Sequence, residues 1–447
     1  MKLWQKEGNL SEKVENFTVG RDRELDIRLA PYDILGSIAH IRMLAEVDLL
    51  SREESKRLGK ALRELYRTAR EGGFEIEPGV EDVHSQVELL LTRKLGEAGK
   101  KIHSGRSRND QVLLDLHLYF RDEIKSLDGL IYQLFQLLQS LADRHRDHLM
   151  PGYTHMQVAM VSSFGLWFSA FAESLTDDTR QLLAAYEIID HNPLGSAAGY
   201  GSSFPLDRQM TTELLGFRDL CYNSIHAQLR RGKTEQALGF ALASLGNTLG
   251  KMAMDICLYM GQNYGFISFP DELCTGSSIM PHKKNPDLFE LVRARCNQLQ
   301  SLPQQLSQLI GNLPAGYHRD FQLLKEIVFP ALDHAKSCLE LSIYGLSQIE
   351  VNQDILDDRE RYKYLFSVDA VNELVMKDVP FRDAYRQVGK EIEKGDFQIP
   401  DTLQHTHEGS IGKLCLDEIN QKMARVRNRF QFERWEEKLR ELVDQGI

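Results

Sequence analysis

The chain has 447 residues, and its 54 lysines and arginines against 65 aspartates and glutamates give a formal net charge of −11. Hydrophobic residues make up 42% and charged residues 27%, which is ordinary for a soluble globular protein and excludes intrinsic disorder. The acidic balance excludes a broad phosphate-binding face, so we expect no nucleic-acid partner.

The beginning of the chain turns polar at once and carries no apolar signal core. The longest uncharged stretch, residues 152–172, is interrupted by polar side chains, so we expect no membrane partner and interpret it as the start of a buried helix. Six widely spaced cysteines favour neither a disulfide framework nor a zinc site. Together these features predict a cytoplasmic protein.

Helical periodicity dominates the sequence, and strand-type alternation is nearly absent. Apolar residues recur every three or four positions along residues 113–141, 238–259 and 299–313, with Pro303 as a kink or restart in the third stretch. Further apolar residues lie off these stripes, as at Leu114, which is typical of helices inside a bundle or at a subunit interface. The sequence therefore predicts an all-α fold.

Glycine- and proline-rich breakers divide the chain into three parts. We expect shorter helices in residues 1–104, long helices in residues 105–355, and short, highly charged helices in residues 356–447. The predicted architecture is a long central helix bundle flanked by two smaller helical domains.

Three polar loops between the apolar helices hold the candidate chemistry. The first, residues 103–111, has several side chains that can donate hydrogen bonds to an anion, among them the permanently charged Arg106 and Arg108. The loop also fits a helix cap, in which Asn109 or Asp110 satisfies the free N–H groups of the next helix. The two interpretations are compatible, because a helix N-terminus also attracts anions.

The second loop, residues 151–157, places His155 at an expected helix start. A lone histidine in such a place is more often a hydrogen-bonded structural residue than a catalyst. Its ordinary pKa, about 6.5, nevertheless suits proton transfer near neutral pH. Both interpretations stay open on the residues alone.

The third loop, residues 276–287, is rich in small residues, which let backbone N–H groups approach a ligand and stabilise a developing oxyanion. Lys283 and Asn285 are suited to hold a carboxylate, whereas the alternative is a flexible linker. The sequence lacks the phosphate-loop, nucleophile-elbow and paired-histidine metal motifs, so we expect no cofactor and no metal.

These loops resemble those of the fumarase/aspartase superfamily and, within it, the argininosuccinate lyase family. The resemblance covers most of the chain. The matched segments are residues 81–84, 105–112, 151–155, 193–196, 276–286 and 317–325.

Members of this family cleave the C–N bond of argininosuccinate to give arginine and fumarate, and the resemblance implies that reaction here. A base removes the proton next to a carboxylate, nearby donors stabilise the carbanion, and an acid protonates the leaving guanidino nitrogen. Such an elimination needs neither a metal nor a redox cofactor.

The resemblance also implies roles for individual residues. Ser277 matches the proton-abstracting residue, supported by Lys283, and His155 matches a second acid–base residue whose charge Glu290 sets; which of Ser277 and His155 handles which proton stays open. The binding residues fall into those that hold the succinyl carboxylates (Ser107, Arg108, Asn109, Thr154 and Asn285), those that hold the arginine portion (Tyr317, Gln322 and Lys325), and His84, which lines the site.

In this superfamily the three loops lie far apart in one subunit and meet where long helices of four subunits pack together. The resemblance thus implies a homotetramer in which each site draws on three chains. Helices that are apolar on several sides favour the same arrangement, since they need partners to cover them.

The chain departs from the family pattern at residues 5–8, at residues 230–232 and at His282, the last being more typical of adenylosuccinate lyase. The serine that family members contribute near residues 17–22 is not placed. Two alternatives therefore stand beside the main hypothesis. One is a sibling lyase acting on adenylosuccinate or a related succinyl amine, and the other is an inactive structural protein like the lens crystallins of this lineage.

Overall fold

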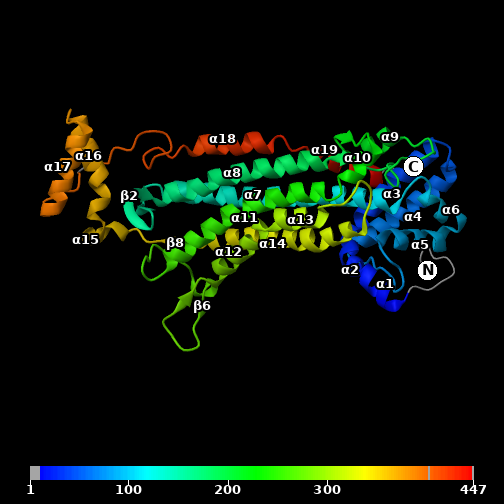
Figure 1. Cartoon of the computed structure of the whole chain (residues 1–447), viewed down its shortest axis with the longest axis horizontal. Coiled ribbons are helices and arrows are strands. Elements are labelled where there is room, and N and C mark those ends of the chain that lie inside the picture. Colours follow the sequence, from blue (N-terminus) through cyan, green and yellow to red (C-terminus); the bar gives the residue numbers. More distant parts are fainter. Residues whose placement is uncertain (1–10, 401–402, 445–447) are drawn as a thin grey trace.

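Long helices that run along one axis form the centre of the molecule in the computed structural model, which describes residues 11–400 and 403–444 (Figure 1). They are α7 (Arg108–Arg144), α8 (Phe164–Ile189), α11 (Lys233–Met260), α12 (Asp287–Gln300), α13 (Leu302–Ile310) and α14 (Leu323–Leu346). Helix α7 packs along α8 and α14, and α11 packs against α8, α12 and α13. The prediction of an all-α fold is confirmed.

The predicted apolar stripes form the core of this bundle. Every stripe residue on α7 is buried, as are Leu114 and Leu118 beside the stripe, because neighbouring helices cover α7 on more than one side. Each buried leucine contributes about 1.5–3 kcal/mol of transfer free energy. The predicted restart at Pro303 is confirmed, since α12 ends at Gln300 and α13 begins at Leu302 with the proline in its first turn.

One end of the bundle carries the N-terminal helices and the last helix of the chain (Figure 1). The helices there are α1 (Glu12–Val19), α2 (Asp22–Asp26), α3 (Ala30–Glu46), α4 (Arg52–Arg70), α5 (Val83–Leu95), α6 (Glu97–Lys100) and α19 (Phe432–Asp444). Helix α19 packs on α3, and its Trp435 ring lies 5.0 Å from the guanidinium of Arg121 on α7. The last helix is thereby fixed to the bundle far from its neighbours in sequence.

The opposite end carries α15 (Arg359–Tyr362), α16 (Ser367–Met376) and α17 (Phe381–Lys394) (Figure 1). These helices have a small core of their own around Val371 and Val388. From there the chain returns along the bundle, where α18 (Leu416–Arg427) packs on α8. Elements after residue 355 thus lie at both ends of the molecule, and the domain boundaries at 104 and 355 stay predictions.

A two-stranded hairpin corrects the expectation that residues 152–172 begin a buried helix. Strands β1 (Leu149–Thr154) and β2 (Gln157–Ser163) pair antiparallel, and only from Phe164 does the chain become helical. Composition alone does not separate a short apolar strand from a buried helix. The hairpin packs against the 3₁₀ turns at Ile355–Asp357 and Lys363–Phe366, contacts that no local pattern in the sequence reveals.

The remaining elements are short. They are α9 (Arg208–Leu214), α10 (Ser224–Leu229), the parallel pair β3 (His191–Asn192) and β4 (Asp219–Leu220), and the antiparallel pairs β5 (Ile267–Ser268) with β8 (Glu350–Val351) and β6 (Thr275–Gly276) with β7 (Lys284–Asn285). Among the described helices, none has the length and apolar character needed to cross a membrane. The departure at residues 5–8 lies outside the described residues.

Candidate active site

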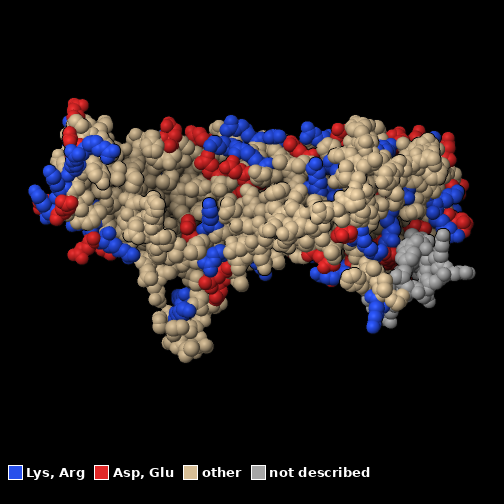
Figure 2. Space-filling model, viewed as in Figure 1, with Lys and Arg blue, Asp and Glu red and all other residues tan. Residues whose placement is uncertain are grey.

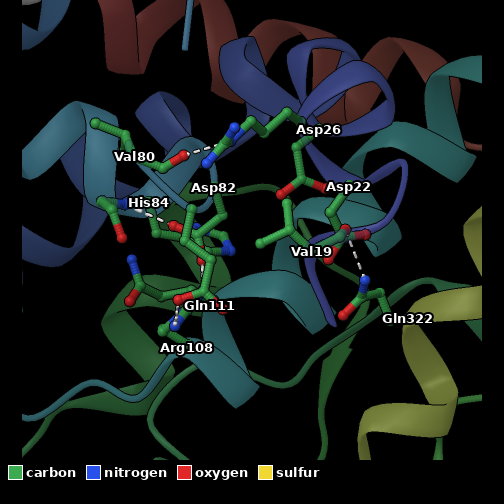
Figure 3. A network of polar contacts seen from close by, with 12 residues as sticks. Val19, Asp22, Asp26, Val80, Asp82, His84, Arg108, Gln111 and Gln322 are labelled. Atoms are coloured by element: carbon green, nitrogen blue, oxygen red, sulfur yellow. Dashed lines mark hydrogen bonds and ion pairs between the residues drawn. The ribbon is translucent and has the colours of Figure 1, made fainter. Parts of the chain in front are cut away.

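A cavity of about 150 Å³ lies near the end of the bundle that carries the N-terminal helices, and it gathers nearly half of the predicted site residues. The predicted residues that line it are His84, Arg108, Asn109, Tyr317, Gln322 and Lys325. Four carboxylates and two further arginines also line it: Asp22, Asp26, Glu81, Asp82, Arg231 and Arg319. Figure 3 shows Asp22 and Asp26 on one side of this polar network and His84, Arg108 and Gln111 on the other.

A capping box at the start of α7 holds Arg108 and Asn109 in place. The Ser107 hydroxyl accepts the Asn109 N–H at 3.3 Å, and the Asp110 carboxylate accepts the Ser107 N–H at 2.8 Å. Ser107 is therefore the N-cap, which corrects the expectation that Asn109 or Asp110 fills that position. The other carboxylate oxygen of Asp110 accepts the N–H groups of Gly195 and Ala197 at 3.0 and 2.9 Å, so residues 193–196 are tied to the same loop.

Arg108 is part of an ion-pair network at the cavity wall. Its guanidinium pairs with Asp82 and with Glu81, the latter at 3.2 Å, and Glu81 also pairs with Arg319 at 2.8 Å. The Arg108 side chain is 35% exposed, so part of its donor edge faces solvent. The planar guanidinium suits two-point recognition of a carboxylate.

Lys325 lies buried between two carboxylates of α2. Its ammonium pairs with Asp22 at 2.7 Å and with Asp26, and although burial acts to lower the pKa of Lys325, these carboxylates raise it. Burial raises the pKa of Asp22 to about 6, against the opposing pull of Lys325. Gln322 donates to the backbone oxygens of Val19 and Thr18 at 2.9 and 3.1 Å, which ties α14 to the N-terminal segment.

Sequence reasoning did not assign Asp22 and Asp26, although it expected a contact from residues 17–22. The signal was the position of this segment in the family, where a serine is usual. Two acidic residues four apart on a short helix carry no motif of their own. They become candidates only because the fold brings α2 against Lys325.

His84 faces two buried carboxylates through one ring nitrogen. Its Nδ1 lies 2.8 Å from an oxygen of Asp33 and 3.5 Å from an oxygen of Asp115. Burial acts to lower the pKa of His84, but the two carboxylates outweigh it and raise the pKa to about 9. The imidazole is therefore charged at neutral pH.

Ser277 lies in the loop between β6 and β7, which projects from the side of the bundle (Figure 1). Its hydroxyl oxygen accepts the backbone N–H groups of Ile279 and Met280 at 3.3 and 3.1 Å. Two such donors stabilise negative charge on a serine oxygen, as a base derived from serine requires. Lys283, Asn285 and Glu290 line a neighbouring cavity of about 570 Å³.

His155 occupies the tip of the β1–β2 hairpin, which corrects its expected place at a helix start. Thr154 pairs with Gln157, so His155 and Met156 form a two-residue loop with φ of 53° and 60°. This left-handed conformation favours Asn-Gly. Any other residue that adopts it lowers the stability of the fold by about 1–2 kcal/mol. The side chain is exposed and has no hydrogen bond within residues 11–400 and 403–444, so the strained turn presents a free imidazole.

Three separate places on the chain therefore hold the predicted site residues. Helix α7 has 37 residues, so about 55 Å separates the cavity at its first turn from the hairpin that follows its last turn. Within the described part of the chain no hydrogen bond or ion pair links His155 to Glu290, whose carboxylate lies 3.8 Å from Arg293. A single chain brings together the residues of each group but not the three groups.

Known proteins resemble this chain along nearly its whole length. A family profile described as "Lyase" matches residues 9–301. An argininosuccinate lyase of Bacteroides fragilis is 56% identical over 436 residues, which cover 98% of this chain and 97% of the relative. The chain belongs to the argininosuccinate lyase family. An argininosuccinate lyase of Thermotoga neapolitana, more distant, is 43% identical over 87% of this chain and 98% of its own length.

Solved structures support the fold. An EDDS lyase in complex with formate has a TM-score of 0.80 at 22% identity, covering 98% of this chain and 96% of that chain. A class II fumarase from Schistosoma mansoni has a TM-score of 0.70 at 15% identity, covering 97% of this chain and 95% of that chain. Family membership confirms the resemblance seen in the loops and the prediction of an enzyme of the carbon–nitrogen lyase class.

Proposed function

We propose that this chain cleaves argininosuccinate into arginine and fumarate, the last step of arginine biosynthesis. The observation that carries the proposal is 56% identity to an argininosuccinate lyase over 98% of the chain. The cavity supports it independently, because it combines cationic donors for carboxylates with acidic groups for the cationic portion of the substrate.

In the proposed reaction Ser277 and His155 move the two protons. The N–H groups of Ile279 and Met280 lower the energy of a negative Ser277 oxygen, and Lys283 supplies positive charge near the carbanion. The exposed imidazole of His155 serves as the second acid–base group once a neighbouring chain brings Glu290 to it. We treat the two residues as a pair that shares the acid and base roles.

The binding residues divide along the substrate. We propose that Ser107, Arg108, Asn109, Thr154 and Asn285 hold the succinyl carboxylates, whereas Tyr317, Gln322 and Lys325 hold the arginine portion, with His84 in the wall. Arg108, Asn109 and the three arginine-side residues share one cavity, which supports this division. Thr154 and Asn285 lie elsewhere on the chain and belong to the part of the site that assembly completes.

We propose a homotetramer in which three chains contribute to each site. The wide separation of the three groups along the bundle supports it. So do apolar side chains exposed on the long helices, including Phe240, Leu291, Leu323 and Tyr344 (54%, 63%, 45% and 51% exposed). Figure 2 shows the middle of the bundle as a face with few charged side chains. Light scattering on the purified protein tests the assembly, and a monomer contradicts it.

We propose the cytoplasm as the compartment of this enzyme. All six cysteines are free, and two of them, Cys296 and Cys338, lie buried in neighbouring helices without forming a disulfide. Unpaired thiols are typical of a reducing compartment.

The deciding experiment follows fumarate formation by ultraviolet absorbance, with argininosuccinate and adenylosuccinate supplied separately. We expect turnover of argininosuccinate alone. Turnover of adenylosuccinate alone contradicts the assignment of the arginine-side residues while leaving the elimination chemistry in place. Failure with both substrates favours either an unfamiliar succinyl substrate or the inactive structural protein.

A further inference from the structure

A buried triad of ionisable side chains lies at one wall of the cavity, which it reaches through His84. Asp33 on α3, His84 on α5 and Asp115 on α7 bring their oxygen and nitrogen atoms within 4.8 Å of one another. The exposed fractions of the three side chains are 2%, 6% and 1%. The amide of Gln111 donates to the same Asp33 oxygen at 3.4 Å.

The imidazole is the group that both carboxylates face. Asp33 makes the shorter contact with Nδ1, and in the described structure neither oxygen of Asp115 has a hydrogen-bond partner. Buried carboxylates are strongly destabilising unless a positive charge or a donor lies beside them. A protonated His84 supplies both to Asp33, whose pKa it lowers although burial acts to raise it. Burial and the neighbouring Asp33 raise the pKa of Asp115 well above its ordinary value, so the charged ring pairs chiefly with Asp33.

The orientation of the ring follows from the same contacts. Because Nδ1 is directed at Asp33 and Asp115, the Nε2 edge is the one left to face the cavity that His84 lines. A neutral ring with its proton on Nδ1 would present a lone pair there and repel an anion. A protonated ring presents an N–H donor and attracts one.

We propose that Asp33 and Asp115 are positioning residues that keep His84 protonated and orient its Nε2 edge toward the cavity. There the Nε2–H donates to a carboxylate of the substrate. This inference rests on the proposed function and deepens it. The carboxylate belongs either to the succinyl half or to the arginine half, since residues matched to both halves line the cavity. Fumarate and arginine, as separate probes, distinguish the two.

The groups that face His84 come from four elements. Asp33 lies on α3, Asp115 on α7 and Asp26 on α2, and all three favour the charged ring. Arg106, in the loop before α7, donates to the Ser37 hydroxyl at 2.9 Å and adds positive charge to the same buried region. Without Asp33, burial still disfavours the protonated ring and the largest opposing contribution is lost, so the pKa of His84 falls even though Asp115 and Asp26 remain.

The test measures dissociation constants of fumarate and of arginine by calorimetry at about pH 6 and about pH 8, where an unperturbed histidine changes charge. It needs no turnover, so a protein that binds a probe but does not cleave argininosuccinate still tests the role of the two carboxylates. Between pH 6 and pH 8 we expect the affinity of Asp33→Asn for one of the two probes to fall. This fall should be about tenfold larger than the one that the unchanged protein shows over the same pH range. Asp115→Asn should show a smaller change in the same direction.

The matched control removes a carboxylate from another buried ion pair. The carboxylate of Asp190 lies 3.0 Å from the guanidinium of Arg121, which is on α7 as Asp115 is. The side chains of Asp190 and Arg121 are 3% and 0% exposed. Asp190→Asn should lower stability and leave the pH dependence of binding as in the unchanged protein. The proposal is overturned if Asp33→Asn and Asp115→Asn fold and bind both probes with unchanged pH dependence. It is equally overturned if Asp190→Asn reproduces their effect, or if the unchanged protein binds neither probe.

Discussion

Burial of His84 between two carboxylates couples the stability of this protein to pH. The folded-state pKa of about 9 lies above the ordinary value near 6.5, so the ring contributes stability that is complete below pH 6.5 and lost as pH rises through 9. The contribution is on the order of 3 kcal/mol. We expect the melting temperature of the unchanged protein to fall more between these pH values than that of His84→Gln, measured by calorimetry. If the melting temperatures of the two proteins fall equally with pH, His84 is not held in its charged form in the folded protein.

Replacing Ser277 separates chemistry from folding. Among the described residues its hydroxyl bonds only to N–H groups of its own loop, so Ser277→Ala should leave the melting temperature nearly unchanged. Loss of the proton-transferring group should lower kcat by about 10³-fold or more. The exposed neighbour Ser278 provides the control, since Ser278→Ala removes an equal hydroxyl from the same loop. Comparable losses in the two variants, followed by fumarate absorbance, contradict the assignment.

Lys325 is the residue whose loss should affect both binding and stability. Lys325→Met keeps the length of the side chain but removes the buried ammonium that pairs with both Asp22 and Asp26. Breaking such a pair costs about 3–5 kcal/mol. We expect a lower denaturation midpoint and a raised KM for argininosuccinate. A stable Lys325→Met with unchanged KM shows that the cavity does not hold the arginine portion.

At the scale of single residues, the sequence predicted those side chains that belong to loop motifs. Residues such as Arg108 and Lys325 do share a cavity, as the family pattern implies. Asp33 and Asp115 escaped notice because they lie on apolar helices 51 and 31 residues from His84, and no spacing rule connects them. Only the packing of α3, α5 and α7 makes them neighbours.

The β1–β2 hairpin is the element whose conformation demands a functional explanation. Met156 has φ of 60° and is 63% exposed, so Met156→Gly removes strain without losing packing. We expect this change to stabilise the protein by about 0.5–1 kcal/mol in denaturant titrations. His155→Asn is the companion variant, because asparagine tolerates the same conformation and cannot transfer a proton. It should keep stability and lose most activity, and full activity in it removes His155 from the proposed chemistry.

The helices could be predicted from the sequence because their apolar spacing is a local property. The hairpin could not be predicted, because its strand conformation depends on contacts with residues distant in sequence. Residues 149–163 look apolar enough for a helix start. Tyr153 packs against Tyr264 and Phe266, with ring centroids 5.7 and 6.3 Å away, and these neighbours lie more than 100 positions along the chain. The tertiary environment therefore selects the strand conformation.

Across the whole molecule, the path of the chain after residue 355 depends on pairs distant in sequence. Arg427 on α18 forms a two-point ion pair with Asp128 on α7, 2.7 Å at its shortest, and stacks on Tyr132. Such pairs direct α18 and α19 back along the bundle instead of into a compact terminal unit. Periodicity predicted that these helices exist but carried no information about where they lie.

The separation of the three residue groups leads to a prediction about the assembled molecule. Arg108→Gln damages the end cavity, and Ser277→Ala damages the β6–β7 loop, so each variant alone should be inactive. If each site takes Arg108 from one chain and Ser277 from another, a mixed assembly contains some sites in which both residues are intact. Co-expression of the two variants should therefore restore part of the fumarate-forming activity, whereas mixing the purified proteins without subunit exchange should not. Co-expressed protein with no activity, despite confirmed mixed assembly, means that one chain supplies both groups. Helix α11 argues against that outcome, because its 28 residues, about 42 Å long, lie between the cavity-lining Arg231 and the segment that carries the β6–β7 loop.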